Sequence, residues 1–496
     1  MASRDDQRMY RFDLLDRTGV FLGFGLVQLG LLGLGGLAST LAVTTGLPLP
    51  VAAAPALVAA AVALGRAGGE RLVDVIPVAI GWVLHRRGRR WHAPLHLLTA
   101  QGDGTDQPPL PPFLAGVRLI EAPGEWGRLA GAGVVHDTTT GAMSAVVRVR
   151  GQDFALAARD EQVRLLAGWG DVLAAFATER GAVARLSWTD FTTPTGMRDH
   201  LAWLAAQPAA ASEASASYRE LLAETGALSA GHDVLVTVTA TRERLTGGHG
   251  RVDVDDRLLS SLGKAVDTLV RGLRTANLLA DDPLTAGEVA AVLRGRLDPT
   301  QMRKASTGSL AERLGLVQPA NAGPLAVSVE WSRVRTDGAW HRTYWIAEWP
   351  RLTQHPDWME PILAFVGSGS RTLTVLFEPV APSASRRRVD RDSIKLDTDA
   401  STRAERGRRV DAGHRRLQAA VAEREAELVA GYAEVAYAGL VTVTADDEQA
   451  LRAACDECEQ IAREHGLELR PLEGRHDLGF AAALPLGLGL ARTWAA

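Results

Sequence analysis

An uncharged amino-terminal segment most limits what this chain can fold into. No Asp, Glu, Lys or Arg occurs in the 48 residues from Thr18 to Gly65. Residues 20–43 are almost wholly apolar, a Pro-containing turn follows, and residues 51–65 are apolar again. A helix rises ~1.5 Å per residue and needs ~20 residues to cross the hydrocarbon core of a bilayer. Residues 20–65 therefore predict a transmembrane helical hairpin, and the first half is long enough by itself.

The charges around this hairpin predict its orientation. The connection between the two spans is uncharged, whereas Arg66, Arg71 and a group of four further Arg residues follow the second span. By the positive-inside rule, both ends of the hairpin face the cytoplasm, so residues 1–19 form a cytoplasmic segment. Those first residues mix Asp with Arg, which is unlike the short basic head of a signal peptide. We therefore expect a protein of the plasma (inner) membrane with two spans and both termini cytoplasmic.

Residues 66–100 form a basic segment with two open interpretations. Residues 72–84 are apolar but too short to span a bilayer. They fit an interfacial helix held by Trp and Arg at anionic headgroups, and they also fit a core helix of the next domain. The residues expected to anchor the chain to membrane lipid are Gly19, Gly23, Trp82, Arg86, Arg87, Arg89, Arg90 and Trp91. The first two have GxxxG spacing, which favours helix packing in lipid but also arises by chance in Gly-rich segments.

The rest of the chain predicts a cytoplasmic α+β body. After a linker at residues 101–112, strand and helix patterns alternate through two regions, 113–320 and 321–496. The fold class is α+β with mixed or antiparallel sheets, and the β-α-β-α-β order of the second region is typical of a sandwich with helices on one face. One long, heavily charged helix is expected at 383–432. Its charge predicts that it is exposed or meets another protein.

Sequence motifs for enzymatic chemistry are missing. The chain has three Lys, and its one Gly-Lys pair, Gly263-Lys264, is followed by Ala265, so no phosphate-binding loop of the Gly-x-x-x-x-Gly-Lys-Ser/Thr type exists. Neither Gly-x-Ser-x-Gly nor His-Glu-x-x-His occurs. Cys455 and Cys458 lie inside a predicted helix without a second pair of zinc ligands, so we interpret them as buried helix-face residues. We expect no catalytic, cofactor-binding or metal-binding residue and no enzyme activity.

Two surface features are candidates for recognition of a partner. A local concentration of Trp at residues 340–358 fits either packing of a hairpin on the sheet or an anchor for another protein. Arg outnumbers Lys by 51 to 3, but acidic residues interleave throughout, so no direct nucleic-acid binding is predicted. The possible partner-docking residues are Trp345, Trp349, Trp358, Arg386, Arg387 and Arg388.

Five stretches together resemble one known family. They are residues 10–19 (YRFDLLDRTG), 344–351 (YWIAEWPR), 377–379 (FEP), 437–444 (YAGLVTVT) and 484–487 (LPLG). The chain resembles the actinobacterial integral membrane protein family encoded beside conjugative, type IV-like secretion ATPases. The likeness runs over nearly the whole length, and its motifs are landmarks of a fold rather than catalytic signatures.

The resemblance implies a two-span inner-membrane subunit fused to a domain like the amino-terminal domain of the VirB-type ATPase, without the motor. Residues 484–487 are similar to the place where that domain hands over to the motor. The implied function is that of a non-enzymatic scaffold subunit of a type IV-like (conjugative) secretion system. Its implied partners are a separately encoded secretion ATPase and other channel subunits, in a homo- or hetero-oligomer.

Two alternative functions stay open at this point. The EccE-type component of type VII secretion also has two amino-terminal spans and a cytoplasmic domain. A membrane-tethered enzyme whose site has no recognisable motif is the other alternative, and a deep pocket with several ionisable groups would favour it.

Overall fold

The structure is a computed structural model that describes residues 26–490 with internal gaps. The residues left out within that range are 68–69, 85–88, 94–109, 125, 152–153, 195–199, 201–202, 205, 207–212, 227–229, 246–253, 300–321, 351, 353, 365–368 and 406–411. The principal helices are α1 (Leu26–Thr44), α2 (Leu49–Leu64), α3 (Leu72–Leu84), α5 (Arg159–Ala174), α7 (Glu213–Gly226), α8 (Val254–Thr275), α9 (Ala286–Leu297), α12 (Glu360–Leu363), α13 (Pro382–Glu405), α14 (Ala412–Ala430), α15 (Glu448–Glu464) and α16 (His476–Ala483).

The described strands form a short two-stranded ribbon and one large antiparallel sheet. The ribbon pairs β1 (Arg66–Ala67) with β2 (Glu70–Arg71). The other strands are β3 (Arg90–His92), β4 (Val117–Glu121), β5 (Gly133–Asp137), β6 (Ala142–Arg150), β7 (Val183–Pro194), β8 (Ala230–Thr241), β9 (Leu279–Pro283), β10 (Ala326–Glu330), β11 (Arg333–Thr336), β12 (Ala339–Glu348), β13 (Ser370–Pro379), β14 (Val435–Ala445) and β15 (Glu468–Pro471).

The 13-stranded sheet runs through both predicted regions of the body. Its order is β3-β10-β11-β12-β14-β13-β7-β8-β6-β5-β4, with β15 beside β12 and β9 beside β6. The central pairing of β7 with β13 joins Thr192 to Arg371 and Leu186 to Phe377 across the expected boundary at residue 320. The α+β class and the antiparallel pairing are confirmed, and the two regions share a single sheet.

Helices cover both faces of this sheet, which corrects the expectation of helices on one face. On one face, Tyr344, Leu373 and Val441 pack with the buried side of α15. On the other face, Thr374 donates to the carbonyl of Ala483 in α16 at 2.9 Å. Strand residues alternate between the two faces, so successive residues such as Leu373 and Thr374 serve different layers. The sheet therefore has two cores, and each one needs its own helical cover.

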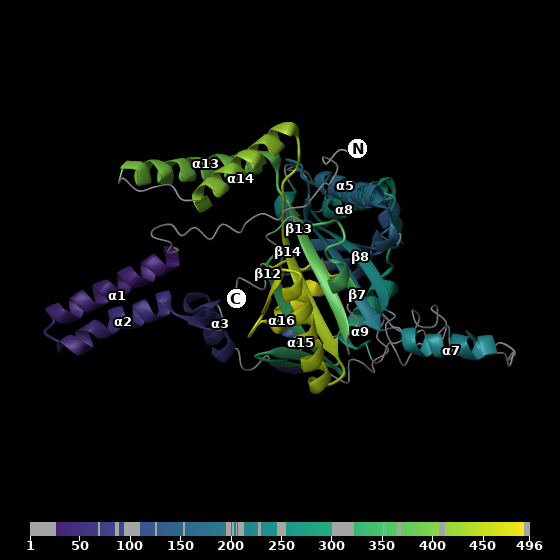
Figure 1. Ribbon diagram of the computed structural model, residues 1–496, viewed down its shortest axis with the longest axis horizontal. Coiled ribbons are helices and arrows are strands. Elements are labelled where there is room, and N and C mark those ends of the chain that lie inside the picture. The colour runs from purple at the N-terminus through teal and green to yellow at the C-terminus, as the bar shows by residue number, and fades with distance from the viewer. Residues whose placement is uncertain are drawn as a thin grey trace.

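The amino-terminal helices project from this body (Figure 1). Helix α1 is long and apolar enough to cross a membrane, judged by length and composition, and only 11% of its apolar window is buried. Helix α2 packs against it: the Gln28 side-chain amide donates to the Ala63 carbonyl at 2.7 Å, and the Ala56 N–H donates to Ser39 at 2.9 Å. The 16 residues of α2 extend about 24 Å, less than the ~30 Å of a hydrocarbon core. One candidate span is thus present, and the second span stays a prediction.

The long helix expected at 383–432 is wrong as a single element. Helix α13 ends at Glu405, α14 begins at Ala412, and the two fold back on each other as an antiparallel pair that projects toward the same side as α1 and α2 (Figure 1). Arg424 lies 3.8 Å from Asp392, and His414 lies 3.6 Å from Asp399. Folding back brings opposite charges on the two halves together, which an uninterrupted helix could not do.

Candidate functional site

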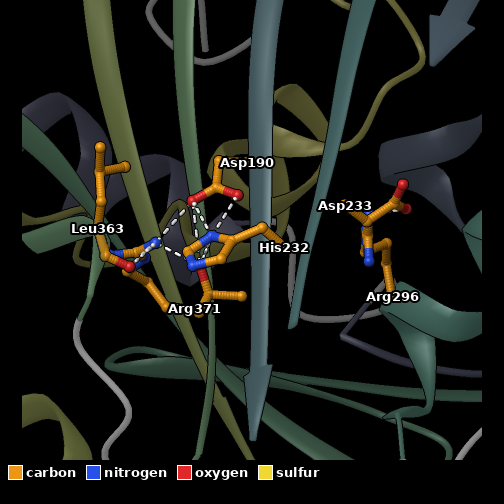
Figure 2. A network of polar contacts seen from close by, with 7 residues as sticks. Asp190, His232, Asp233, Arg296, Leu363 and Arg371 are labelled. Atoms are coloured by element: carbon orange, nitrogen blue, oxygen red, sulfur yellow. Dashed lines mark hydrogen bonds and ion pairs between the residues drawn. The ribbon is translucent and has the colours of Figure 1, made fainter. Parts of the chain in front are cut away.

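A buried ion pair lies at the centre of the sheet, where β7, β8 and β13 run side by side (Figure 2). Nη2 of Arg371 lies 2.7 Å from Oδ2 of Asp190, and each side chain is only 1% exposed. The strand register places Arg371 and His232 on either side of Thr192. The Thr192 hydroxyl donates to Asp190 at 3.0 Å, and Nδ1 of His232 lies 3.1 Å from Oδ1. One carboxylate therefore gathers three polar side chains.

Because Arg371 is buried, loss of its partner Asp190 would lower the free energy of unfolding. Burial lowers the pKa of its guanidinium below the ordinary value, while Asp190 acts in the opposite direction. Nη2 also donates to the Leu363 carbonyl at 3.1 Å. Among the residues that the structure describes, Nε and Nη1 have no hydrogen-bond partner. Buried ion pairs of this kind contribute little net stability, but removing one partner is strongly destabilising.

A second charged cluster lies on the opposite face of the same strands. Asp233 accepts from Arg148 at 2.9 Å and from Arg296 at 2.8 Å, and the Arg296 guanidinium lies 3.5 Å from the centre of the Phe191 ring. Burial acts to raise the pKa of Asp233, but the two guanidinium groups hold it below its ordinary value. Burial also lowers the pKa of Arg296 to about 10. In both clusters each carboxylate lies beside at least one guanidinium group.

The prediction that the two Cys residues are buried on one face of a helix is confirmed. Cys455 and Cys458 are free and buried in the core beneath α15. Burial raises the pKa of Cys455 to about 11 and that of Cys458 to about 12. Both thiols are therefore protonated at neutral pH, which is unsuited to nucleophilic or metal-binding chemistry. Within the described ranges, no group of three or more His, Cys, Asp or Glu is arranged to hold a metal ion.

The predicted Trp docking residues are divided between the two faces of the sheet. The Trp349 ring makes edge contacts with Trp358 at 6.2 Å and with Tyr437 at 5.4 Å between centroids. Both Trp residues are half-buried against the core beneath α15. Trp345 instead packs beside Leu376 and Leu440 on the other face. Packing onto the sheet thus accounts for much of their surface.

The predicted Arg docking residues lie together on an exposed surface. Arg386, Arg387 and Arg388 are exposed on α13. Arg388 lies 3.3 Å from Glu434, which also accepts from Arg424 of α14 at 2.6 Å. These contacts hold the base of the α13–α14 pair against the start of β14. The helices beyond that base carry mostly exposed side chains.

The predicted membrane-anchoring residues have mixed outcomes. Gly19, Gly23, Arg86 and Arg87 lie outside the described residues. The Arg89 guanidinium lies 3.5 Å from the centre of the Trp82 ring, and Trp82 makes an edge contact with Trp331 of the body at 5.6 Å. Trp82 and Trp91 both pack against the apolar cluster beneath α9 and α16, and Arg90 is exposed on β3. Trp82 and residues 89–92 thus contact the body, although no residue of α3 is buried.

Sequence reasoning missed the buried network altogether. The available signal was a charge inside a strand pattern: Asp190 interrupts residues 183–194, and Arg371 opens residues 370–379. A charge in a buried strand needs a partner, but the sequence alone does not say which strand is adjacent. That information comes only from the pairing of β7 with β13.

The fold defines an α+β protein with one antiparallel sheet and an apolar amino-terminal helix. No protein-family model matches the chain, and no curated protein matches it in sequence.

Proposed function

We propose that this protein is a non-enzymatic, membrane-anchored scaffold of a type IV-like secretion system that docks a separately encoded ATPase. The membrane anchor is inferred from the exposed apolar side chains of α1. Leu34, Leu37 and Leu41 are 69%, 71% and 64% exposed. A soluble protein seldom presents so continuous an apolar surface to water. Under this proposal α1 and α2 both enter the membrane, and both termini are cytoplasmic.

The α13–α14 pair supplies the docking surface in this proposal. It projects from the sheet, is mostly exposed, and begins with three consecutive Arg residues at 386–388. Charged surfaces of this kind steer association and select partners more than they supply affinity. The identity of the partner, a secretion ATPase, rests on the resemblance of the sequence motifs.

The test uses the full chain extracted in detergent and the secretion ATPase encoded beside it. We expect the wild-type chain to retain the ATPase on an affinity column. In this proposal an acidic surface of the ATPase faces these Arg residues, so reversing two exposed charges, Arg386→Glu with Arg387→Glu, should lower retention by about tenfold or more. Arg164→Glu with Arg219→Glu is the matched control, since these two Arg residues are also exposed, on α5 and α7.

Two outcomes would overturn the proposal. One is a wild-type chain that retains no ATPase and elutes as a monomer. The other is equal retention by the wild type and the double variant, which would remove α13–α14 from the interface.

A further inference from the structure

A cleft of about 590 Å³ opens beside α8, away from the buried network. The polar flank of α8 forms one wall, the connection between α5 and β7 forms another, and residues just after β8 complete it. Trp126 and Phe176 supply aromatic surface in the lining. The volume lies within the ~300–1,000 Å³ that is typical of small-molecule sites.

The lining of this cleft is strongly basic. Its ionisable side chains are four basic residues, Arg180, Arg244, Arg257 and Lys264, and one acidic residue, Asp256. The chain as a whole carries a net charge of -4, so this cluster runs against the average. A concave surface of one charge raises the local concentration of the opposite charge.

Two acids next to the cleft residues in the chain are engaged elsewhere. Glu179, next to Arg180 in the chain, accepts from the backbone N–H and the hydroxyl of Ser383 at 2.6 and 2.8 Å. Asp255, next to Asp256, lies 2.5 Å from Arg242. Neither carboxylate lines the cleft.

Among the described residues, the Arg244 side chain is hydrogen-bonded within the fold, and the side chains of Arg180 and Lys264 are not. Arg244 donates to the carbonyls of Val183 and Pro379 at 2.9 and 3.2 Å, so it ties strand ends together. In the part of the chain that the structure describes, no hydrogen bond or ion pair involves the side chains of Arg180 and Lys264, which are exposed at the mouth of the cleft. Lys264 is one of only three Lys in the chain.

Hydroxyl groups complete the donor set. Ser260 and Ser261 line the cleft one turn before Lys264 on α8, and Thr178 lines it from the opposite wall. Guanidinium, ammonium and hydroxyl donors around a concave site are the groups that proteins use to bind phosphate oxygens.

We propose that this cleft binds a small, soluble, phosphate-bearing anion through Arg180, Lys264 and the serine hydroxyls of α8. A lipid headgroup offers the same chemistry. However, α5 and α8 lie on the side of the body remote from α1 and α2, so the cleft does not face the bilayer that α1 would enter (Figure 1). The half-buried Trp126 ring offers a surface on which an organic part of the ligand can pack.

The scarcity of Lys provides a direct reporter for this binding. Reductive methylation of the full chain with ¹³C-formaldehyde, done before the chain is placed in zwitterionic nanodiscs, labels the three Lys amines and the α-amino group and keeps the Lys charge. The signal that disappears in Lys264→Arg is assigned to Lys264. Titration with pyrophosphate, at ionic strength held constant with sodium chloride, should shift that signal saturably and leave the signal of Lys395 on α13 unmoved.

Affinity is then measured on unlabelled protein by calorimetry. Arg180→Ala combined with Lys264→Ala should weaken pyrophosphate binding by about tenfold or more, because two charge-assisted contacts are lost. Lys395→Ala is the matched control and should bind as the wild type does. Circular dichroism of the double variant checks that it is folded, and Ser261→Ala should weaken binding without changing any charge.

Three results would overturn the proposal. They are no saturable shift of the Lys264 signal, equal affinity in the double variant and the wild type, and a Lys264 signal that responds to phosphatidylglycerol in the nanodisc but not to pyrophosphate. The last would assign the cleft to a lipid headgroup instead of a soluble anion.

Discussion

Two helical pairs project from the same sheet, and they are opposites in chemistry. The α1–α2 pair contains no Asp, Glu, Lys or Arg, and its large exposed hydrophobic side chains are Leu and Val. The α13–α14 pair is rich in Arg, Asp and Glu and buries only Ser385, Val389 and His414 within its helices. A pair of helices that projects from the body buries little of its surface. Its exposed side chains must therefore suit the medium around it, whether lipid or water. The comparison teaches that shape alone does not assign either pair a role, whereas surface composition does.

The contacts between paired helices differ in the same way. In α1–α2 the helices meet at Gly35, where an added Cβ would lie 2.3 Å from the Cβ of Ala59. In α13–α14 they meet through charges, such as Arg424 of α14 with Asp392 of α13 at 3.8 Å. Close backbone approach suits a medium without hydrophobic driving force, and ion pairs suit a surface in water. The predictions that follow probe first the body that carries both pairs and then each pair.

The largest effect is expected from a change in the body. Asp190→Ala leaves the guanidinium of Arg371 buried without its carboxylate, which costs about 3–5 kcal/mol of unfolding free energy. Asp282→Ala removes an ion pair with Arg128 whose Asp side chain is 77% exposed, so it should cost less than ~1 kcal/mol. Urea unfolding of both variants checks this. Similar losses in both would show that the central network is no more important than a surface pair.

The next prediction tests whether the α1–α2 pair lies in lipid while the α13–α14 pair lies in water. Leu34→Arg puts a charge on the outward face of α1, where Leu34 is 69% exposed, and Ile394→Arg does the same on α13, where Ile394 is 66% exposed. A charge at the centre of a membrane span costs about 2.5–3.5 kcal/mol, and a charge in water costs almost nothing. We expect only Leu34→Arg to leave the carbonate-resistant membrane fraction. Full retention of that variant would contradict a membrane role for α1.

A smaller effect tests how α1 meets α2. Gly35→Ala forces its new methyl group against Ala59 and should disfavour the pair by about 1–3 kcal/mol. Gly36→Ala is the control, because a Cβ there meets nothing within 4 Å. The readout is the rate of disulfide formation between Gln28→Cys and Ala63→Cys, two positions that lie close together because the Gln28 side chain reaches the backbone carbonyl of Ala63 at 2.7 Å. If Gly36→Ala slows the reaction as much as Gly35→Ala does, the close approach is not what joins the helices.

The smallest effect is a pH dependence at the base of α13–α14. Burial acts to raise the pKa of Glu434, but the Ser385 hydroxyl, Arg424 and Arg388 hold it below its ordinary value of 4.5. Because the folded pKa is depressed, the stabilisation is complete above about pH 4.5 and is lost as the pH falls through the folded value. Glu434→Gln should therefore lower thermal stability at about pH 7 by less than ~1 kcal/mol and have a smaller effect at about pH 3. An unchanged difference at both pH values would exclude ionisation as its cause.

The sequence predicted the parts of the fold that depend on local pattern. The turn at 138–141 between β5 and β6 and the N-cap of α9 are local features of this kind: Thr285 accepts from the backbone N–H of Glu288 at 3.3 Å, and the Glu288 carboxylate accepts from that of Thr285 at 2.8 Å. Such features depend on neighbours in the chain, so a single sequence carries them. The Asp337-Gly338 turn joins β11 to β12, and the four-residue β11 is too short to show an alternation pattern in the sequence.

Contacts between residues far apart in the chain could not be predicted from the sequence alone. The separation of α15 and α16 onto opposite faces depends on which residues of β12, β13 and β14 lie in register. The Asp190–Arg371 pair joins residues 181 positions apart, and the basic cleft collects side chains from several separate segments. A hydrophobic pattern records which residues are buried and not which ones meet.

The strand β3 gives the molecule a mechanical property. It follows α3 closely in the chain and pairs Arg90, Trp91 and His92 with β10 at the edge of the sheet, and backbone hydrogen bonds at Arg89 and Ala93 extend this short ladder. A pull on the amino-terminal helices acts on this short ladder and on the contact of Trp82 with Trp331 before it reaches the eleven-residue pairing of β7 with β8. These small contacts limit how much force the amino-terminal helices can transmit to the rest of the protein.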